Sequence, residues 1–376
     1  MKISPVHCSI VPPHILSRLL RAEDPRHVAF ARRTLETDAY ERTRRRLTTV
    51  VGAPPVALPE GALADQPHRT VYDARHSTDL PGRRVLSEGS AHGEDATVNR
   101  AYEGLRATFE FYQEVYGRNS IDGNGLPLDA TVHYGEGYCN AFWNGEQMVF
   151  GDGDRDVFLD FTIPIDVIGH ELTHGVSQYT ANLSYFGQPG ALNESISDIF
   201  GSLIKQYALG QTVGEADWLI GAGLLGPHIA GMALRSMKAP GTAYDDVLLG
   251  RDPQPATMDD FVRTSRDNGG VHINSGIPNH AFYLVAEALG GHAWEKAGQI
   301  WYDVLTGGQL PQDALFSDFA KLTVVAAVAR YGHGVESDAT VNAWGQVGVL
   351  EGGKGVPTAH TPPGPPFGDE DDWDEE

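Results

Sequence analysis

Cysteine is nearly absent from this sequence of 376 residues, which contains only Cys8 and Cys139. Two cysteines cannot build a disulfide framework, and they are too few for a structural zinc site made of thiolates. The chain must therefore draw its stability from a buried core. Its length and its hydrophobic content of 41% are enough for two domains with such a core.

Positive charge and long apolar runs are also scarce. The chain has 28 Lys and Arg against 50 Asp and Glu, a formal net charge of −22, which argues against binding nucleic acid. No apolar run reaches the ~18–20 residues that a membrane helix needs, so we expect no membrane partner. The first twenty residues contain three prolines and a single basic residue ahead of the apolar stretch, so we expect no Sec-type signal peptide.

The most informative stretch is IDVIGHELTHGVSQY at 165–179, which we interpret as a helix carrying His170, Glu171 and His174. On a helix, residues four apart lie roughly 40° apart around the axis and about 6 Å along it, so both imidazoles can reach one ion. Two nitrogen donors supply half of a tetrahedral zinc site, and Glu171 could reach a water on the metal's open side. The same spacing also arises by chance in ordinary helices.

A second helical pattern, GALNESISDIFG at 190–201, follows shortly after the first. It is opened by Gly190, and it offers Glu194 as a third ligand and Asp198 one turn later. Two His and one Glu, with the fourth position left to water, form the ligand set of hydrolytic zinc sites. The two stretches together therefore favour a catalytic zinc centre.

Further blocks in the chain carry a resemblance to a known family. HELTH, LNESISD and DNGGVHINSGIPNHAFYL at 267–284 resemble the thermolysin family of zinc metalloendopeptidases, as do NAFWNGEQMVFGDGD at 140–154 and YTANLSYFGQPGALNE at 179–194. The blocks keep the family's order from about Thr70 to about Leu350. The resemblance implies a two-domain α+β fold with one catalytic zinc ion at the domain junction.

The pattern of residues agrees with two catalytic domains. Residues 67–163 are β-rich with one helix at 97–117 that Asp95 or Thr97 could cap, and the segments at 128–154 predict strands of an antiparallel sheet. Residues 164–350 are mostly helical, with the zinc helix at the junction. The helices expected there are 164–180, 191–209, 276–289, 293–305 and 315–331.

The resemblance also implies roles for residues around the metal. It makes Tyr185 and His272 hydrogen-bond donors to the tetrahedral oxyanion, with Asp267 orienting His272. Asn193 and Asp198 are implied to hold the rings of the two histidine ligands in the required tautomer. Glu171 is the general base that moves a proton from water to the leaving nitrogen.

Substrate contacts follow from the same matching. Asn140 and Ala141 lie on a candidate edge strand, to which a substrate backbone could add as an extra strand, and Arg235 would hold a substrate carbonyl. Apolar residues match the positions that line the family's S1′ pocket, and they imply cleavage before bulky hydrophobic residues. These residues are Phe158, Phe161, Val167, Ile220 and Leu234.

Residues 1–66 form a leader in which 14–49 predicts helix and 50–67, rich in Pro, Gly and Ala, predicts a linker. The leader carries ten Lys and Arg against seven Asp and Glu, so it is mildly basic, whereas the body is acidic. This contrast favours an intramolecular prosegment, and SIVPPHIL near the start resembles the short propeptide of the protealysin-like branch. An N-terminal subdomain that stays attached is the alternative.

Cys8 precedes the VPPHIL stretch of this leader. A thiolate is a strong zinc ligand, so Cys8 could cap the metal and keep the precursor inactive. A free, partly buried thiol that behaves as a small hydrophobe is the alternative.

The family's calcium-binding members build a double calcium site from acidic residues, but calcium is doubtful here. Asp166 and Asp217 are retained, whereas Lys205 and Ala222 stand where acids of that site would be, and Met232 stands where an aspartate of a further calcium site would be. Calcium needs about six to eight oxygen ligands. We predict instead that the Lys205 ammonium lies within salt-bridge distance of Asp166, of Asp217 or of both, unless it points into solvent.

The sequence as a whole predicts a zinc metalloendopeptidase made as a zymogen, acting on proteins and peptides, inhibited by its own propeptide, and monomeric. A catalytically silent protein that binds zinc and peptides is one alternative, and an aminopeptidase on a related fold is another. Secretion is implied by the resemblance, although a cytoplasmic zymogen or non-classical export stays open. The tail at 351–376 is Pro/Gly-rich and then acidic, and we expect it to be disordered.

Overall fold

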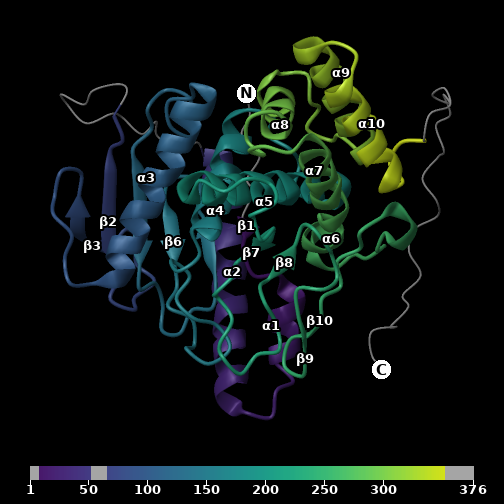
Figure 1. Cartoon of the computed structure of the whole chain (residues 1–376). Coiled ribbons are helices and arrows are strands. Elements are labelled where there is room, and N and C mark those ends of the chain that lie inside the picture. Colours follow the sequence, from purple (N-terminus) through teal and green to yellow (C-terminus); the bar gives the residue numbers. More distant parts are fainter. Residues whose placement is uncertain (1–7, 52–65, 352–376) are drawn as a thin grey trace.

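The computed structural model describes residues 8–51 and 66–351 (Figure 1). Most of the expected linker and of the acidic tail lies outside these residues. Among the described residues, no helix is both long and apolar enough to cross a membrane. The described part contains a strand-rich half, a helical half and a leader that lies against both of them.

The leader contains one short strand and two helices. Strand β1 is Cys8–Ser9, helix α1 is Pro13–Leu19, and helix α2 is Pro25–Val51. The single helix expected over 14–49 is therefore interrupted by a turn at residues 20–24. Proline favours the first turn of a helix, because its missing N–H would have no partner there, and a proline begins each of the two helices.

The strand-rich half is built on a six-stranded sheet with the order β1-β5-β6-β4-β2-β3. The leader thus supplies one outer strand of the sheet. The other strands are β2 (Arg69–Asp73), β3 (Arg83–Ser87), β4 (Leu128–Val132), β5 (Ala141–Trp143) and β6 (Met148–Phe150).

The sheet is mixed rather than antiparallel. β5 and β6 form the expected antiparallel hairpin, but β4 runs parallel to both β2 and β6, so the antiparallel prediction for 128–154 is wrong for β4. Helix α3 (Ala96–Tyr116) lies between β3 and β4 in the chain and provides a crossover long enough for parallel pairing. The carboxylate of Asp95 caps this helix by accepting from the N–H groups of Thr97 and Val98.

The helical half contains seven helices within the described residues: α4 (Ile165–Tyr179), α5 (Gly187–Leu209), α6 (Asp267–Asn274), α7 (Gly276–Leu289), α8 (Ala297–Thr306), α9 (Phe316–Tyr331) and α10 (Val335–Gln346). α5 begins three residues before Gly190, α8 begins later than expected, and α6 and α10 were not predicted. Between α5 and α6 the chain forms two short ladders, of β7 (Leu219–Ile220) with β8 (Arg235–Ser236) and of β9 (Asp245–Asp246) with β10 (Gly250–Arg251), and then a 3-10 turn at Met258–Asp260.

Helices α4 and α5 pack antiparallel in the centre of the molecule, between the sheet and the other C-terminal helices (Figure 1). They approach closely because glycines lie at the contact. A Cβ atom added to Gly201 of α5 would lie 2.5 Å from the carbonyl oxygen of Asp166 on α4. Nearly every residue of α4 is buried, including the polar ones, so their polar atoms must find partners inside the protein.

Candidate active site

Three residues predicted as zinc ligands converge between α4 and α5. The Nε2 atoms of His170 and His174, one helical turn apart, are 3.0 Å from each other, and each lies 3.5 Å from a carboxylate oxygen of Glu194. Ligands held ~2.0–2.1 Å from one tetrahedral zinc ion would be roughly 3.3 Å apart. The spacing of these three groups therefore fits a zinc ion.

The far sides of both imidazole rings face side-chain oxygens. His170 Nδ1 lies 2.8 Å from Asp198 Oδ1, and His174 Nδ1 lies 2.8 Å from Asn193 Oδ1. The hydroxyl of Ser197, which was not predicted, is 3.0 Å from His174 Nδ1. With Nδ1 engaged, each ring presents Nε2 to the centre, which is the arrangement of metal-ligating histidines.

Glu171 points to the same centre from α4. Its Oε2 accepts a hydrogen bond of 3.0 Å from the backbone N–H of Trp143 on β5, and its buried Oε1 has no hydrogen-bond partner among the described residues. Burial raises the pKa of this carboxyl group to about 8. A carboxylate with a pKa near neutrality can both take and return a proton, as a general base must.

His272 faces the centre from the other side, on a sharply turned segment. Residues 267–270 all have positive φ, which allows the carboxylate of Asp267 to accept from the His272 N–H at 2.9 Å and to lie 2.6 Å from its Nδ1. Burial opposes a charge on the ring, but the carboxylates of Asp267 and Glu194 outweigh it and raise the His272 pKa to about 9. Tyr185 donates its hydroxyl hydrogen to Glu194 and lies 3.4 Å from His272 Nε2.

The leader strand lies across these groups. β1 pairs antiparallel with β5, with Cys8 opposite Trp143 and Ser9 opposite Phe142. Without the leader, β5 next to Asn140 is the outer strand of the sheet, and β1 adds to it as an extra strand. The carbonyl oxygen of Ser9 accepts a hydrogen bond of 3.1 Å from His272 Nε2.

The leader residues that follow are held by three of the predicted substrate-binding residues. The N–H of Ile10 donates to the carbonyl of Ala141 at 3.2 Å, and the N–H of Val11 donates to Asn140 Oδ1 at 2.9 Å. Arg235 Nη1 donates to the carbonyl oxygen of Ile10 at 3.0 Å. The leader is thus bound through its backbone, in the extended form that an added strand takes.

Arg235 is fixed by a buried ion pair with Asp198. The Nε and Nη2 atoms of Arg235 each lie 2.8 Å from a carboxylate oxygen of Asp198. Asn279 on α7, which was not predicted, donates to the same carboxylate at 2.9 Å. Asp198 therefore connects the His170 ring to the arginine that holds the leader. Asn279 lies inside the block at 267–284, and that block was the available signal for it.

The predicted apolar pocket residues are all buried in one cluster. Ile10 of the leader belongs to the same cluster. The predicted members are Phe158, Phe161, Val167, Ile220 and Leu234. The Ile10 side chain is thus fully buried, as the predicted pocket residues are.

Comparison with known proteins agrees with this geometry. Residues 60–178 match the thermolysin metallopeptidase catalytic domain, and residues 181–349 match the alpha-helical domain of thermolysin metallopeptidases. The chain belongs to the thermolysin family of metallopeptidases. It is a zinc metalloendopeptidase with the two-domain fold of that family, whose enzymes use zinc.

Individual relatives cover most of the chain. The extracellular metalloprotease of Pectobacterium carotovorum subsp. carotovorum is 52% identical over 93% of this chain and 98% of its own length. Thermolysin of Alicyclobacillus acidocaldarius subsp. acidocaldarius is 41% identical over 74% of this chain and 50% of its own length. The solved precursor of protealysin, a metalloproteinase from Serratia proteamaculans, is 51% identical with a TM-score of 0.83, covering 91% of this chain and all of that one.

The leader of this thermolysin-family chain is also held through buried acids on α2. The carboxylate of Asp38 accepts hydrogen bonds from the Tyr138 hydroxyl at 2.5 Å and from Asn140 Nδ2 at 3.1 Å, and Glu41 accepts from the Tyr134 hydroxyl at 3.2 Å. The sequence suggested a basic leader attracted to an acidic body. In these buried contacts, however, the leader contributes carboxylates and the body contributes neutral donors.

A second cluster of charges lies at the other end of the α4–α5 pair. Lys205 Nζ is 2.7 Å from Asp166 Oδ2, 2.8 Å from Asp217 Oδ1 and 2.7 Å from the carbonyl oxygen of Leu219. The predicted proximity of Lys205 to both acids is therefore confirmed. Burial opposes the charge on Lys205, but Asp166 and Asp217 outweigh it and raise the lysine pKa. Ala222 brings no side-chain oxygen to this region, and Met232 is exposed.

Proposed function

We propose that His170, His174 and Glu194 hold the zinc ion, and that the enzyme cleaves peptide bonds that precede bulky hydrophobic residues. The observation that carries this proposal is the way the leader is bound. His272 donates a hydrogen bond to the Ser9 carbonyl oxygen, and Arg235 donates one to the Ile10 carbonyl oxygen. The residues expected to hold a substrate therefore bind an extended peptide.

Each of the protein groups has a separate role in hydrolysis. When bound, zinc supplies the Lewis acid that polarises a carbonyl and acidifies water. Glu171, with one oxygen fixed by Trp143, takes the proton from water and delivers it to the leaving nitrogen. His272 and Tyr185 donate hydrogen bonds to the oxyanion, and such a donor contributes about 10²–10³ in rate.

Specificity for a bulky hydrophobic residue after the cleaved bond is supported by Ile10. Its backbone is held by Ala141 and Arg235, and its side chain is fully buried in the main apolar core, to which Phe158 and Val167 also belong. A substrate residue in its place would bury a side chain of similar size, and such burial is worth about 1.5–3 kcal/mol.

The leader is proposed as the propeptide, with residues 1–66 removed on activation. It occupies the substrate position, so the enzyme must lose it before other proteins can bind. Relatives of this chain bear the name extracellular metalloprotease, which supports action outside the cell. Calcium is proposed to be dispensable, because Lys205 neutralises two of the acids that a calcium ion would need.

The proposal is tested by incubating the purified, processed enzyme with casein, with and without a zinc chelator, and sequencing the new N-termini. We expect bulky hydrophobic residues at the new N-termini and no cleavage with chelator. The Glu171→Gln variant is the control, since it should keep its zinc and cleave nothing. Cleavage that persists in the chelator would contradict the zinc mechanism, and new termini without a hydrophobic preference would contradict the pocket.

A further inference from the structure

We propose that Cys8 Sγ is the fourth zinc ligand in the leader-bound chain, and that it keeps the Ser9–Ile10 peptide bond, which lies in the position of a scissile bond, from being hydrolysed. This inference rests on the zinc site proposed above. It assigns the latency of the precursor to one sulfur atom, in addition to the blocking of the cleft by the leader.

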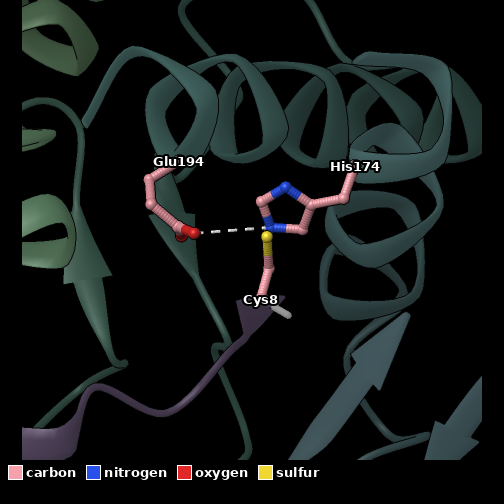
Figure 2. A group of neighbouring side chains, drawn as sticks. All are labelled: Cys8, His174 and Glu194. Atoms are coloured by element: carbon pink, nitrogen blue, oxygen red, sulfur yellow. Dashed lines mark ion pairs between the residues drawn. The ribbon is translucent and has the colours of Figure 1, made fainter. Parts of the chain in front are cut away.

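The first observation is the convergence of three potential ligand atoms. Cys8 Sγ, a ring nitrogen of His174 and a carboxylate oxygen of Glu194 all lie within 4.8 Å of one another. Figure 2 shows the three side chains pointing toward a common point, with Cys8 reaching it from the leader strand. All three residues are buried, so solvent does not separate them.

A second observation points to a ligand at this place independently of the cysteine. Glu194 is 1% exposed, and its Oε2 has no hydrogen-bond partner among the described residues. A buried carboxylate oxygen without a donor is costly unless a cation is nearby. The Nε2 atoms of His170 and His272 lie 3.5 Å from this oxygen without a hydrogen bond to it, so a cation bound at this place would give it a direct partner.

The chemistry of a thiolate suits this position. A catalytic zinc site has three protein ligands and keeps its fourth position for water, whereas structural sites close all four positions, often with cysteine sulfur at about 2.3 Å. With Cys8 in the fourth position, the site changes from the open type to the closed type. The pairing of β1 with β5 holds Cys8 opposite Trp143 and so fixes the sulfur in place.

The register of the leader explains why a closed site is needed. The Ser9 carbonyl lies 3.1 Å from the proposed oxyanion donor His272, while Ile10 is held by Ala141 and Arg235. If water gained access, it would add to the carbonyl carbon of Ser9, and the bond to the Ile10 nitrogen would break. The products would be a carboxylate at Ser9 and a free amine at Ile10.

The second cysteine of the chain provides a matched control. Cys139 is likewise buried and outside any disulfide bond, but its sulfur contacts the carbonyl oxygen of Gly137 at 3.4 Å. It is not in the group of residues that could hold a metal. Cys139→Ser therefore removes a buried thiol from the same precursor without touching the proposed ligand.

The decisive measurement uses cobalt in place of zinc, because cobalt bound to a thiolate shows a charge-transfer band in the near ultraviolet. The precursor carries Glu171→Gln, so that the leader stays intact while the ligands remain. We expect the band in this precursor and in its Cys139→Ser form, and its loss in Cys8→Ser and Cys8→Ala at unchanged cobalt content.

The possible outcomes separate this inference from the proposed function. A precursor that binds cobalt without a thiolate band, or a band that survives both Cys8 substitutions, would overturn the role of Cys8 and leave the zinc site intact. Failure of every variant to bind cobalt would overturn the zinc site, and the Cys8 inference with it.

A second experiment tests the consequence for the peptide bond. In the precursor with Glu171 intact, Cys8→Ala should release residues 1–9 and yield a chain whose N-terminus is Ile10, at a rate independent of protein concentration. Cys139→Ser should process no faster than the unmodified precursor. A Cys8→Ala precursor whose Ser9–Ile10 bond stays as stable as in Cys139→Ser would show that the sulfur does not protect it.

Discussion

Two clusters of charged side chains lie at opposite ends of the α4–α5 helix pair, and they differ in the source of the cation that neutralises their carboxylates. At one end, the side chains of His170, His174 and Glu194 converge. At the other end, Asp166 and Asp217 converge on the ammonium group of Lys205. On the proposed function the first cluster takes a zinc ion from solution, whereas the second contains the ammonium group of Lys205.

On the proposed function, the helix pair keeps one metal site, and a lysine takes the place of another metal ion. Catalysis needs a cation with an exchangeable position, which an ammonium group does not offer. Structural neutralisation of two carboxylates needs only charge and hydrogen bonds, and a lysine on the neighbouring helix provides both. Substitutions at the metal end should therefore act on turnover, and substitutions at the lysine end should act on stability.

The largest effect is expected at the metal end. Glu171→Gln should reduce peptide hydrolysis by about 10⁴, at the upper end of what a general base contributes, because the base is lost while the metal ligands remain. Zinc content and peptidase activity are measured on the same sample. Turnover close to that of the unmodified enzyme would contradict the role of Glu171.

At the lysine end, Lys205→Ala should destabilise the protein by on the order of 3 kcal/mol, because Asp166 is left buried without its cation. Lys296→Ala is the matched control, since Lys296 makes an ion pair of the same length, 2.7 Å, with Glu336 at the surface. An exposed pair contributes only about 0–1 kcal/mol. Denaturant unfolding should separate the two variants, and equal losses would refute the argument from burial.

The Lys205→Glu variant sharpens the comparison, because it should make the stability of the lysine end depend on a cation from solution. Lys205→Glu should make the melting temperature rise when calcium is added, because three carboxylates would then meet there. Zinc content should be unchanged. A large stabilisation of the unmodified protein by calcium would show that Lys205 does not replace the ion.

A smaller effect on turnover is expected from His272. Its Nε2 contacts the Ser9 carbonyl, so His272→Ala should lower kcat by about 10²–10³ and change KM little, since the hydrogen bond to the oxyanion forms in the transition state. His280→Ala is the control, because His280 lies nearby in the sequence and contacts the Met237 carbonyl instead. A defect confined to KM would assign His272 to substrate binding.

The smallest effect is expected at Asp38, a buried carboxylate that accepts hydrogen bonds from neutral donors. Burial raises the pKa of Asp38 to about 6, against hydrogen bonds from Tyr138 and Asn140 and the charge of Arg42. Because this pKa is higher in the folded chain than in the unfolded one, the protonated group stabilises the precursor below about pH 4. That stabilisation, on the order of 2 kcal/mol, is lost as the pH rises to about 6.

The test is unfolding of the Glu171→Gln precursor across this pH range. Asp38→Asn should flatten the pH dependence, whereas Glu36→Gln, at an exposed position on the same helix, should leave it unchanged. Identical pH profiles for Asp38→Asn and the parent would show that Asp38 does not titrate in this range.

The sequence by itself determined the features that depend on neighbours within one helix. His170 and His174 face one point because residues four apart share a helix face, and Asp198 follows Glu194 by one turn for the same reason. The charge substitution at Lys205 was also readable, because the resemblance to the calcium-binding relatives implies an acid at that position. Helix ends were less accurate, as at Gly187, where α5 begins earlier than its polar residues suggested.

The tertiary structure alone decided how distant segments meet. Four features join residues that are far apart in the chain: the parallel pairing of β4, the hydrogen bond from Trp143 to Glu171, the hydrogen bond from Asn279 to Asp198, and the pairing of β1 with β5. No local periodicity encodes such contacts, because they depend on how whole elements pack. The sequence raised two fates for Cys8, and only the folded chain places its sulfur beside His174 and Glu194, because strand pairing sets the register of the leader.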